Sequence, residues 1–139
     1  MITAMKKVLT AFFLMIALAS CEFNVIEPRY DYRDSITGHY GVEEYSETYN
    51  DVAYYSLSIT KDYHSRHTIY ITNFYASGLR VYARLDGNKV TIPYQVVDDY
   101  EIEGVGTLYG HELSINYRIK DLYHNTRADF CELWGALEY

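Results

Sequence analysis

The sequence is short of several features that would point to particular protein classes. Its 139 residues include only two cysteines, two prolines and one tryptophan. Two cysteines cannot form the framework of a disulfide-rich domain. Lys and Arg number 12 against 19 Asp and Glu. This acidic balance argues against a nucleic-acid binder, which needs a basic face toward the phosphates. Tyrosine, in contrast, is abundant, with 17 residues.

The N-terminal residues have the pattern of a secretory signal. Lys6 and Lys7 precede the apolar run 11–19, which is too short to cross a bilayer core of about 20 residues. The run ends in Leu-Ala-Ser-Cys at 18–21, which resembles the lipobox of bacterial lipoproteins. The resemblance implies cleavage before Cys21 and lipidation of its thiol. A plain signal peptide or a short anchor helix is the alternative.

We therefore expect three regions: a signal peptide at 1–20, a lipidated N-terminus and tether at 21–35, and one folded domain at 36–139. The lipid would anchor the protein in the bacterial cell envelope, at the outer membrane, because two or three acyl chains hold a protein firmly. Lipidation of Cys21 would leave Cys131 without a partner. We expect Cys131 to be a small buried hydrophobe rather than a reactive thiol.

From residue 36 onward the chain shows a period of two, with β-branched and aromatic residues throughout, which is typical of β-strands. Short strands at regular spacing predict an all-β sandwich or barrel. Eight strands in an antiparallel meander can close on themselves and so remove their edges. The predicted strands are 37–46, 52–60, 67–73, 79–85, 89–96, 100–108, 112–120 and 128–138.

The turns between these strands fix a consistent register. A two-residue turn at Gly87-Asn88 places the apolar residues of 79–85 and those of 89–96, Tyr94 and Val96 included, on one inward face. Gly110-His111 does the same for the next hairpin, and a loop centred on Ala76 sets Tyr70 opposite Tyr82. Nearly all inward positions are bulky, which predicts a filled interior.

Several short motifs along the domain resemble a known family. They are Gly38-x-Tyr40, Ser58 to Lys61, Ile71 to Phe74, Val90 to Pro93, Gly104-x-Gly106-Thr107 and Ser114 to Tyr117. Together they are similar to the small lipocalin-like lipoproteins of Bacteroidetes-type bacteria, with Tyr40 where lipocalins carry tryptophan. The resemblance implies a calycin-type barrel on the cell envelope, and it implies no activity.

The sequence gives little support to catalysis or metal binding. His64 and His67 have HxxH spacing but lack the adjacent glutamate of a helical zinc motif. The acidic residues at 98–103 fit an exposed charged stripe better than a calcium loop. We expect no enzyme activity, no catalytic or metal residues and no cofactor, although the fold could still assemble a carboxylate pair.

Aromatic residues in alternate loops suggest a binding site. In a meander, the loops after the first, third, fifth and seventh strands share one end of the barrel, and here that end faces away from the membrane. These loops carry the candidate ligand-mouth residues Tyr49, Phe74, Tyr75, Tyr100 and Tyr123. Aromatic rings among carboxylates suit sugar rings or cationic groups.

We therefore expect a binding module for a small amphipathic or glycan-like ligand. A protein-interaction module, acting as an inhibitor or as an accessory subunit of an envelope complex, is the second hypothesis. A chain with 17 tyrosines will also place some of them in any loop by chance.

Overall fold

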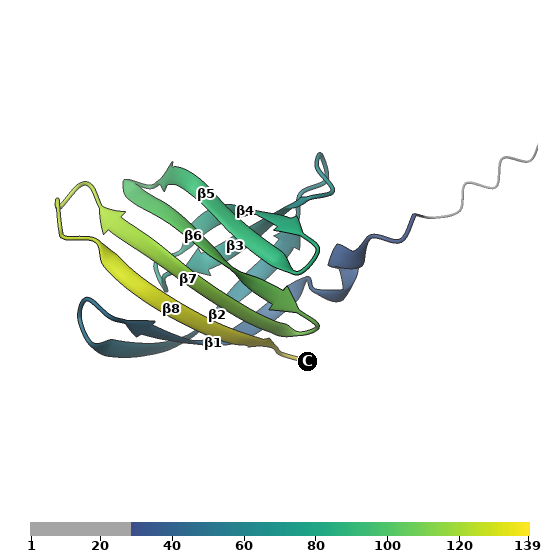
Figure 1. Ribbon diagram of the computed structural model, residues 1–139, viewed down its shortest axis with the longest axis horizontal. Helices are drawn as coiled ribbons and strands as arrows, with labels where there is room; N and C mark the ends of the chain where they lie inside the picture. The colour runs from purple at the N-terminus through teal and green to yellow at the C-terminus, as the bar shows by residue number, and fades with distance from the viewer. Residues whose placement is uncertain (1–28) are drawn as a thin grey trace, which may run out of the picture. The chain divides into compact units, whose positions relative to one another are not determined.

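Eight antiparallel strands close into a barrel in the computed structural model, which describes residues 29–139 (Figure 1). Each strand pairs with the next, and β8 pairs with β1. This confirms the predicted meander. The predicted signal, Cys21 and most of the predicted tether lie outside the described residues. The strands are β1 (Gly38–Ser46), β2 (Asp51–Lys61), β3 (Thr68–Phe74), β4 (Leu79–Asp86), β5 (Lys89–Val97), β6 (Tyr100–Tyr109), β7 (Glu112–Asp121) and β8 (Asp129–Leu137).

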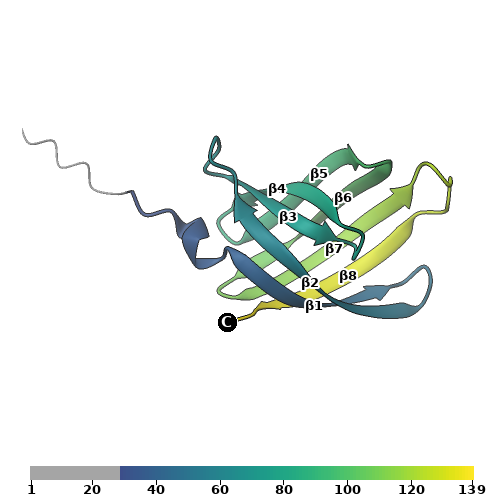
Figure 2. The ribbon, with the colours of Figure 1, turned by 180° about the vertical axis from the view of Figure 1, so that it is seen from behind.

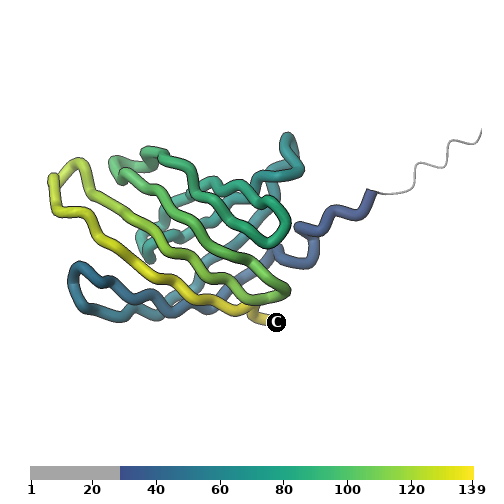
Figure 3. Tube along the Cα trace, viewed as in Figure 1, coloured from purple at the N-terminus to yellow at the C-terminus, as the bar shows by residue number. Residues whose placement is uncertain are grey.

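The loops gather at two ends of the barrel, as the tube in Figure 3 shows. We call the end with the loops after β1, β3, β5 and β7 the far end, and the other the near end. Both short hairpins of the near end have the predicted register. Leu85 pairs with Val90 around Gly87, and Leu108 pairs with Leu113 around Gly110. The two glycines have φ values of 58° and 60°, which glycine adopts at no steric cost.

The inward side chains fill the barrel. Side chains from every strand are less than 5% exposed, among them Leu57, Val81, Ile92, Ile115 and Leu133. Tyr40 is fully buried and donates a hydrogen bond to the carbonyl of Ile36 at 2.8 Å. Binding deep inside the barrel is therefore disfavoured, as the bulky inward residues predict.

The inward prediction is wrong for two residues of β5. Tyr94 and Val96 are 58% and 52% exposed, because the register shifts between Ile92 and Gln95. Such a bulge reverses the alternation that follows it. Pro93 has no N–H to donate, so it cannot continue the β4–β5 ladder. The buried Gln95 side chain takes its place: its amide donates to the carbonyl of Tyr82 at 2.9 Å and accepts the Tyr82 N–H at 3.1 Å.

A second bulge lies at the far end of β3. The register shifts between Thr72 and Phe74 at Asn73, which has a φ of 65°. The side-chain amide of Asn73 donates to the carbonyl of Ser56 at 2.8 Å. This contact lies just beyond the β2–β3 ladder, which ends at Ser58 and Thr72. Thus one side-chain amide bridges each of the two seams beside the β3–β4 hairpin. Figure 2 shows this hairpin in the view from behind the barrel.

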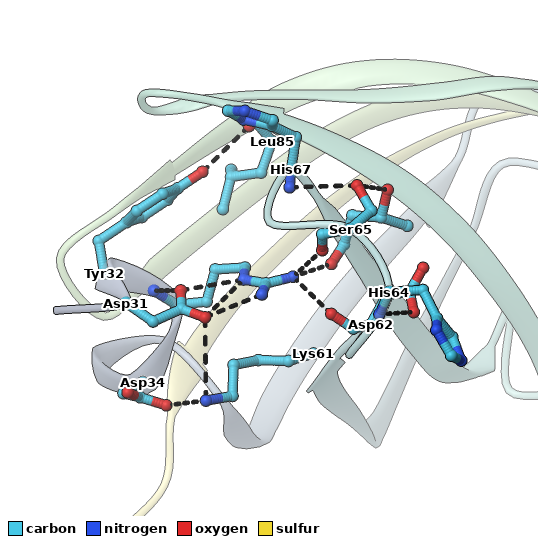
Figure 4. Close-up of polar contacts among 11 residues, drawn as sticks. Asp31, Tyr32, Asp34, Lys61, Asp62, His64, Ser65, His67 and Leu85 are labelled. Atoms are coloured by element: carbon cyan, nitrogen blue, oxygen red, sulfur yellow. Dashed lines mark hydrogen bonds and ion pairs between the residues drawn. The ribbon is translucent and has the colours of Figure 1, made fainter. Parts of the chain in front are cut away.

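A short 3-10 helix, η1 (Tyr32–Ser35), packs at the near end. The folded unit begins at Asp31, five residues before the predicted start of the domain. Arg33 explains the difference, because its buried guanidinium donates to the carbonyls of Asp62, Ser65 and Thr68. Figure 4 shows these contacts. No helix within residues 29–139 is long and apolar enough to span a bilayer.

Candidate functional site

The far-end loops enclose a pocket of about 220 Å³, which we call the far-end pocket. It brings together Tyr49, Tyr75 and Tyr100, three of the five residues that the sequence analysis proposes for a ligand mouth. They come from the loop after β1, the loop after β3 and the first residue of β6. The lining residues are Tyr49, Tyr75, Tyr100, Ile119, Asp121, Thr126, Arg127 and Asp129.

Asp129 is the most buried polar group of the pocket, with 3% of its surface exposed. One carboxylate oxygen accepts a hydrogen bond from the Tyr75 hydroxyl at 2.7 Å, and the other accepts one from Ser46 at 2.5 Å. Tyr75 has a φ of 57°, and its ring lies 6.5 Å from that of Tyr100. The hydrogen bond to Asp129 therefore holds the Tyr75 ring in place at the pocket.

The rim of the pocket carries charges of both signs. Arg127 donates to the carbonyl of Thr48 at 3.0 Å, and its guanidinium lies 5.3 Å from the ring centre of Tyr49. Asp121 accepts hydrogen bonds from the backbone N–H of His124 at 3.0 Å and from its ring at 2.7 Å. These bonds lower the pKa of Asp121. The pocket lining therefore brings aromatic rings, a cation and fixed carboxylates close together.

The other two candidates lie outside the pocket. Phe74 is fully buried, and its ring centre lies 4.5 Å from that of Tyr117. It is therefore a core residue, because the bulge at Asn73 turns it inward. Tyr123 is 79% exposed, and its ring packs edge-on against His124.

Sequence analysis missed a second buried carboxylate. Glu44 is 5% exposed and accepts hydrogen bonds from the hydroxyls of Tyr55 at 2.6 Å and Tyr117 at 2.5 Å. Burial raises the pKa of Glu44, although the two hydroxyls oppose the shift. Cys131 is a buried free thiol whose pKa is raised by the same burial. The alternation of inward and outward residues could have revealed both carboxylates. Glu44 takes the next inward position after Tyr40 and Val42 on β1, and Asp129 takes the first inward position on β8.

The raised pKa of Glu44 predicts a pH-dependent stability. Because folding favours the protonated acid, the stabilisation is complete below the ordinary value of 4.5 and is lost as pH rises through the raised pKa. Glu44→Gln keeps a neutral group. We therefore expect the unfolding free energy of the wild type, relative to that of Glu44→Gln, to be constant below pH 4.5 and to fall as the pH rises above it. Urea denaturation of both proteins at a series of pH values measures this difference in unfolding free energy. A difference that stays constant or rises with pH would contradict the raised pKa of Glu44.

The structure does not bring the HxxH histidines or the acidic residues at 98–103 together into a site. His64 and His67 are exposed, and the backbone N–H of His64 donates to the Asp62 carboxylate at 2.9 Å. Glu101 forms an ion pair with Arg118 at 3.2 Å, while Glu103 is exposed on the barrel surface. Within residues 29–139, no group of three or more His, Cys, Asp or Glu side chains could hold a metal ion.

Comparison with known proteins does not help to interpret the site. No family model matches the chain, and no curated protein matches it. The far-end pocket must therefore be interpreted from its own geometry.

Proposed function

We propose that this chain is an envelope lipoprotein whose barrel is a non-catalytic binding module for a small amphipathic or glycan-like ligand. The far-end pocket carries the proposal, because Tyr49, Tyr75 and Tyr100 converge there around a buried, fixed carboxylate. The filled interior supports binding at the mouth rather than in depth. A volume of about 220 Å³ is below the usual range for drug-sized ligands, so it fits one sugar ring or one end group.

The non-catalytic part of the proposal is supported by how the carboxylates are held. Asp129 and Glu44 are each almost fully buried, and each accepts hydrogen bonds from two hydroxyl groups. A general acid or base must instead reach the proton that it transfers. These carboxylates are suited to fixing the tyrosine rings.

Removal of the two pocket tyrosines that are not tied to Asp129 tests the ligand site. A panel of monosaccharides, oligosaccharides and acylated amphiphiles should contain at least one ligand of the wild type. Tyr49→Ser/Tyr100→Ser should weaken that binding at least tenfold, as measured by calorimetry, because the ring contacts are lost. Tyr123→Ser is the matched control, and it should bind normally. Failure of the whole panel, or equal loss in the control, would contradict the proposal.

The envelope anchor has a separate test, because it rests on the lipobox at Cys21 alone. A tagged fatty acid fed to the expressing cells should label the wild type and not Cys21→Ser. The wild type should also sediment with membranes, whereas Cys21→Ser should be released. Label that persists on Cys21→Ser would rule out lipidation at this residue.

A further inference from the structure

A second concave surface crosses the outside of the barrel. This groove, which we call the outer groove, has a volume of about 800 Å³ and runs over β2, β1, β8, β7 and β6. Three exposed aromatic side chains line it: Tyr54, Tyr109 and Trp134, which are 75%, 71% and 45% exposed. Small residues, such as Gly41 and Ala136, lie between them.

Strand register shows that these aromatic residues belong to one face. Tyr54 on β2 pairs with Glu43 on β1, which pairs with Trp134 on β8. Trp134 in turn pairs with Ser114 on β7. Tyr54 and Trp134 thus lie two strands apart, or about 10 Å along the sheet.

The charge of the outer groove has one sign. Its charged lining residues are Glu43, Glu112 and Glu138. None of the three forms an ion pair with any residue in the part of the chain that the structure describes. Lys89 lies beside Thr107 at the β5 end of the groove, but it is not a lining residue. The groove therefore presents three uncompensated carboxylates among aromatic rings.

We propose that the outer groove binds a cationic polypeptide segment rich in arginine or lysine, a role beyond the ligand site at the far end. Arginine and lysine pair with carboxylates and also pack over aromatic faces. Five strands span about 19 Å, which an extended chain covers with about six residues.

Two other occupants fit the charges less well. A neutral sugar donates hydroxyl hydrogen bonds to carboxylates but leaves their three negative charges unneutralised, whereas a cationic segment neutralises them. A second copy of the chain, with a formal charge of −7, would bring like charges together.

Trp134 makes the proposal directly measurable, because it is the only tryptophan of the chain. The probe is a synthetic octapeptide of alternating Arg and Gly, with a Glu–Gly octapeptide and N-acetylglucosamine hexamer for comparison. The Arg–Gly peptide should shift the tryptophan emission, with an affinity that falls as salt rises. The triple variant E43Q/E112Q/E138Q should weaken binding at least tenfold.

A second triple variant separates local contact from net charge. Asp86, Asp98 and Asp99 are exposed acids outside the outer groove, so D86N/D98N/D99N changes the net charge equally and should bind almost as well as the wild type. Tyr49→Ser/Tyr100→Ser should bind the Arg–Gly peptide as well as the wild type does. This result would show that the peptide does not bind at the far-end pocket.

Four results would overturn the proposal: no emission shift with the Arg–Gly peptide; equal losses in the two triple variants; tighter binding of the sugar hexamer; or self-association, seen by sedimentation, that E43Q/E112Q/E138Q abolishes.

Discussion

Replacing Gly106 by alanine is expected to lower the free energy of unfolding by about 3 kcal/mol, the upper part of the range for overpacked sites. A Cβ at this position would lie 2.0 Å from the Ser114 carbonyl oxygen and 2.8 Å from the Cα of Ile115. Both atoms belong to the backbone of β7, so no rotamer change relieves the clash. Gly106 thus allows β6 to approach β7 closely inside the barrel.

Gly41→Ala is the matched control, because it makes the same substitution within a strand. Its Cβ would meet the carboxyl end of the Glu138 side chain, which is exposed and can rotate away. We expect this variant to unfold within about 1 kcal/mol of the wild type, since alanine also restricts the unfolded chain. Urea denaturation of both variants decides the matter. Equal midpoints for the two would show that the β6–β7 approach is not constrained by Gly106.

Arg33→Ala is the second substitution expected to have a large effect, again about 3 kcal/mol. The Arg33 guanidinium is 4% exposed and donates to the carbonyls of Asp62, Ser65 and Thr68 at 3.0, 2.5 and 2.6 Å. Its other nitrogens bind the Asp31 carboxylate, with a closest contact of 2.8 Å. Alanine would remove all these side-chain contacts at the near end. Arg33→Lys should recover only part of the loss, because an ammonium lacks the planar fork.

Lys61→Ala supplies the contrast within the same cluster. Lys61 pairs with the exposed Asp34 carboxylate, and exposed ion pairs contribute little to stability because solvent screens them. Thermal melts of the three variants should therefore rank Arg33→Ala well below Arg33→Lys, with Lys61→Ala near the wild type. Equal melting temperatures for Arg33→Ala and Lys61→Ala would contradict this prediction. They would show that the contacts of Arg33 do not hold the 3-10 helix firmly to the barrel.

The strand order and most of the register could be predicted because alternation and turn chemistry are local. Tyr70 does lie opposite Tyr82, with the Arg80 guanidinium 3.7 Å from the Tyr70 ring centre. The errors in the side-chain orientation of Phe74, Tyr94 and Val96 lie at or beyond bulges, where one extra residue reverses the alternation. Pro93 could have signalled the first bulge, because a missing N–H must end a ladder. Asn73 carries no comparable signal, so Phe74 was misplaced.

The candidate site was predictable only in part. Loop parity brought Tyr49, Tyr75 and Tyr100 to one end of the barrel, which needs only the topology. Asp129 and Glu44 were missed because charged residues are usually exposed, and hydroxyl donors distant in sequence make their burial tolerable. Ser46 and Asp129, for example, are 83 residues apart. Such pairs follow from the closed barrel and not from any local pattern.

The two amide-bridged seams, β2–β3 and β4–β5, also predict which part of the barrel unfolds locally first. At the far end, β3 and β4 pair with each other, whereas the β2–β3 and β4–β5 ladders stop at Thr72 and Arg84, and the side chains of Asn73 and Gln95 bridge the seams beyond those points. Few hydrogen bonds therefore resist a local opening of this hairpin, compared with the continuous ladder from β6 to β8. Amide hydrogens near the tip of the hairpin should exchange with solvent by sub-global opening, well before those of β7. Since Tyr75 lies in that tip, each opening also takes apart the wall of the far-end pocket.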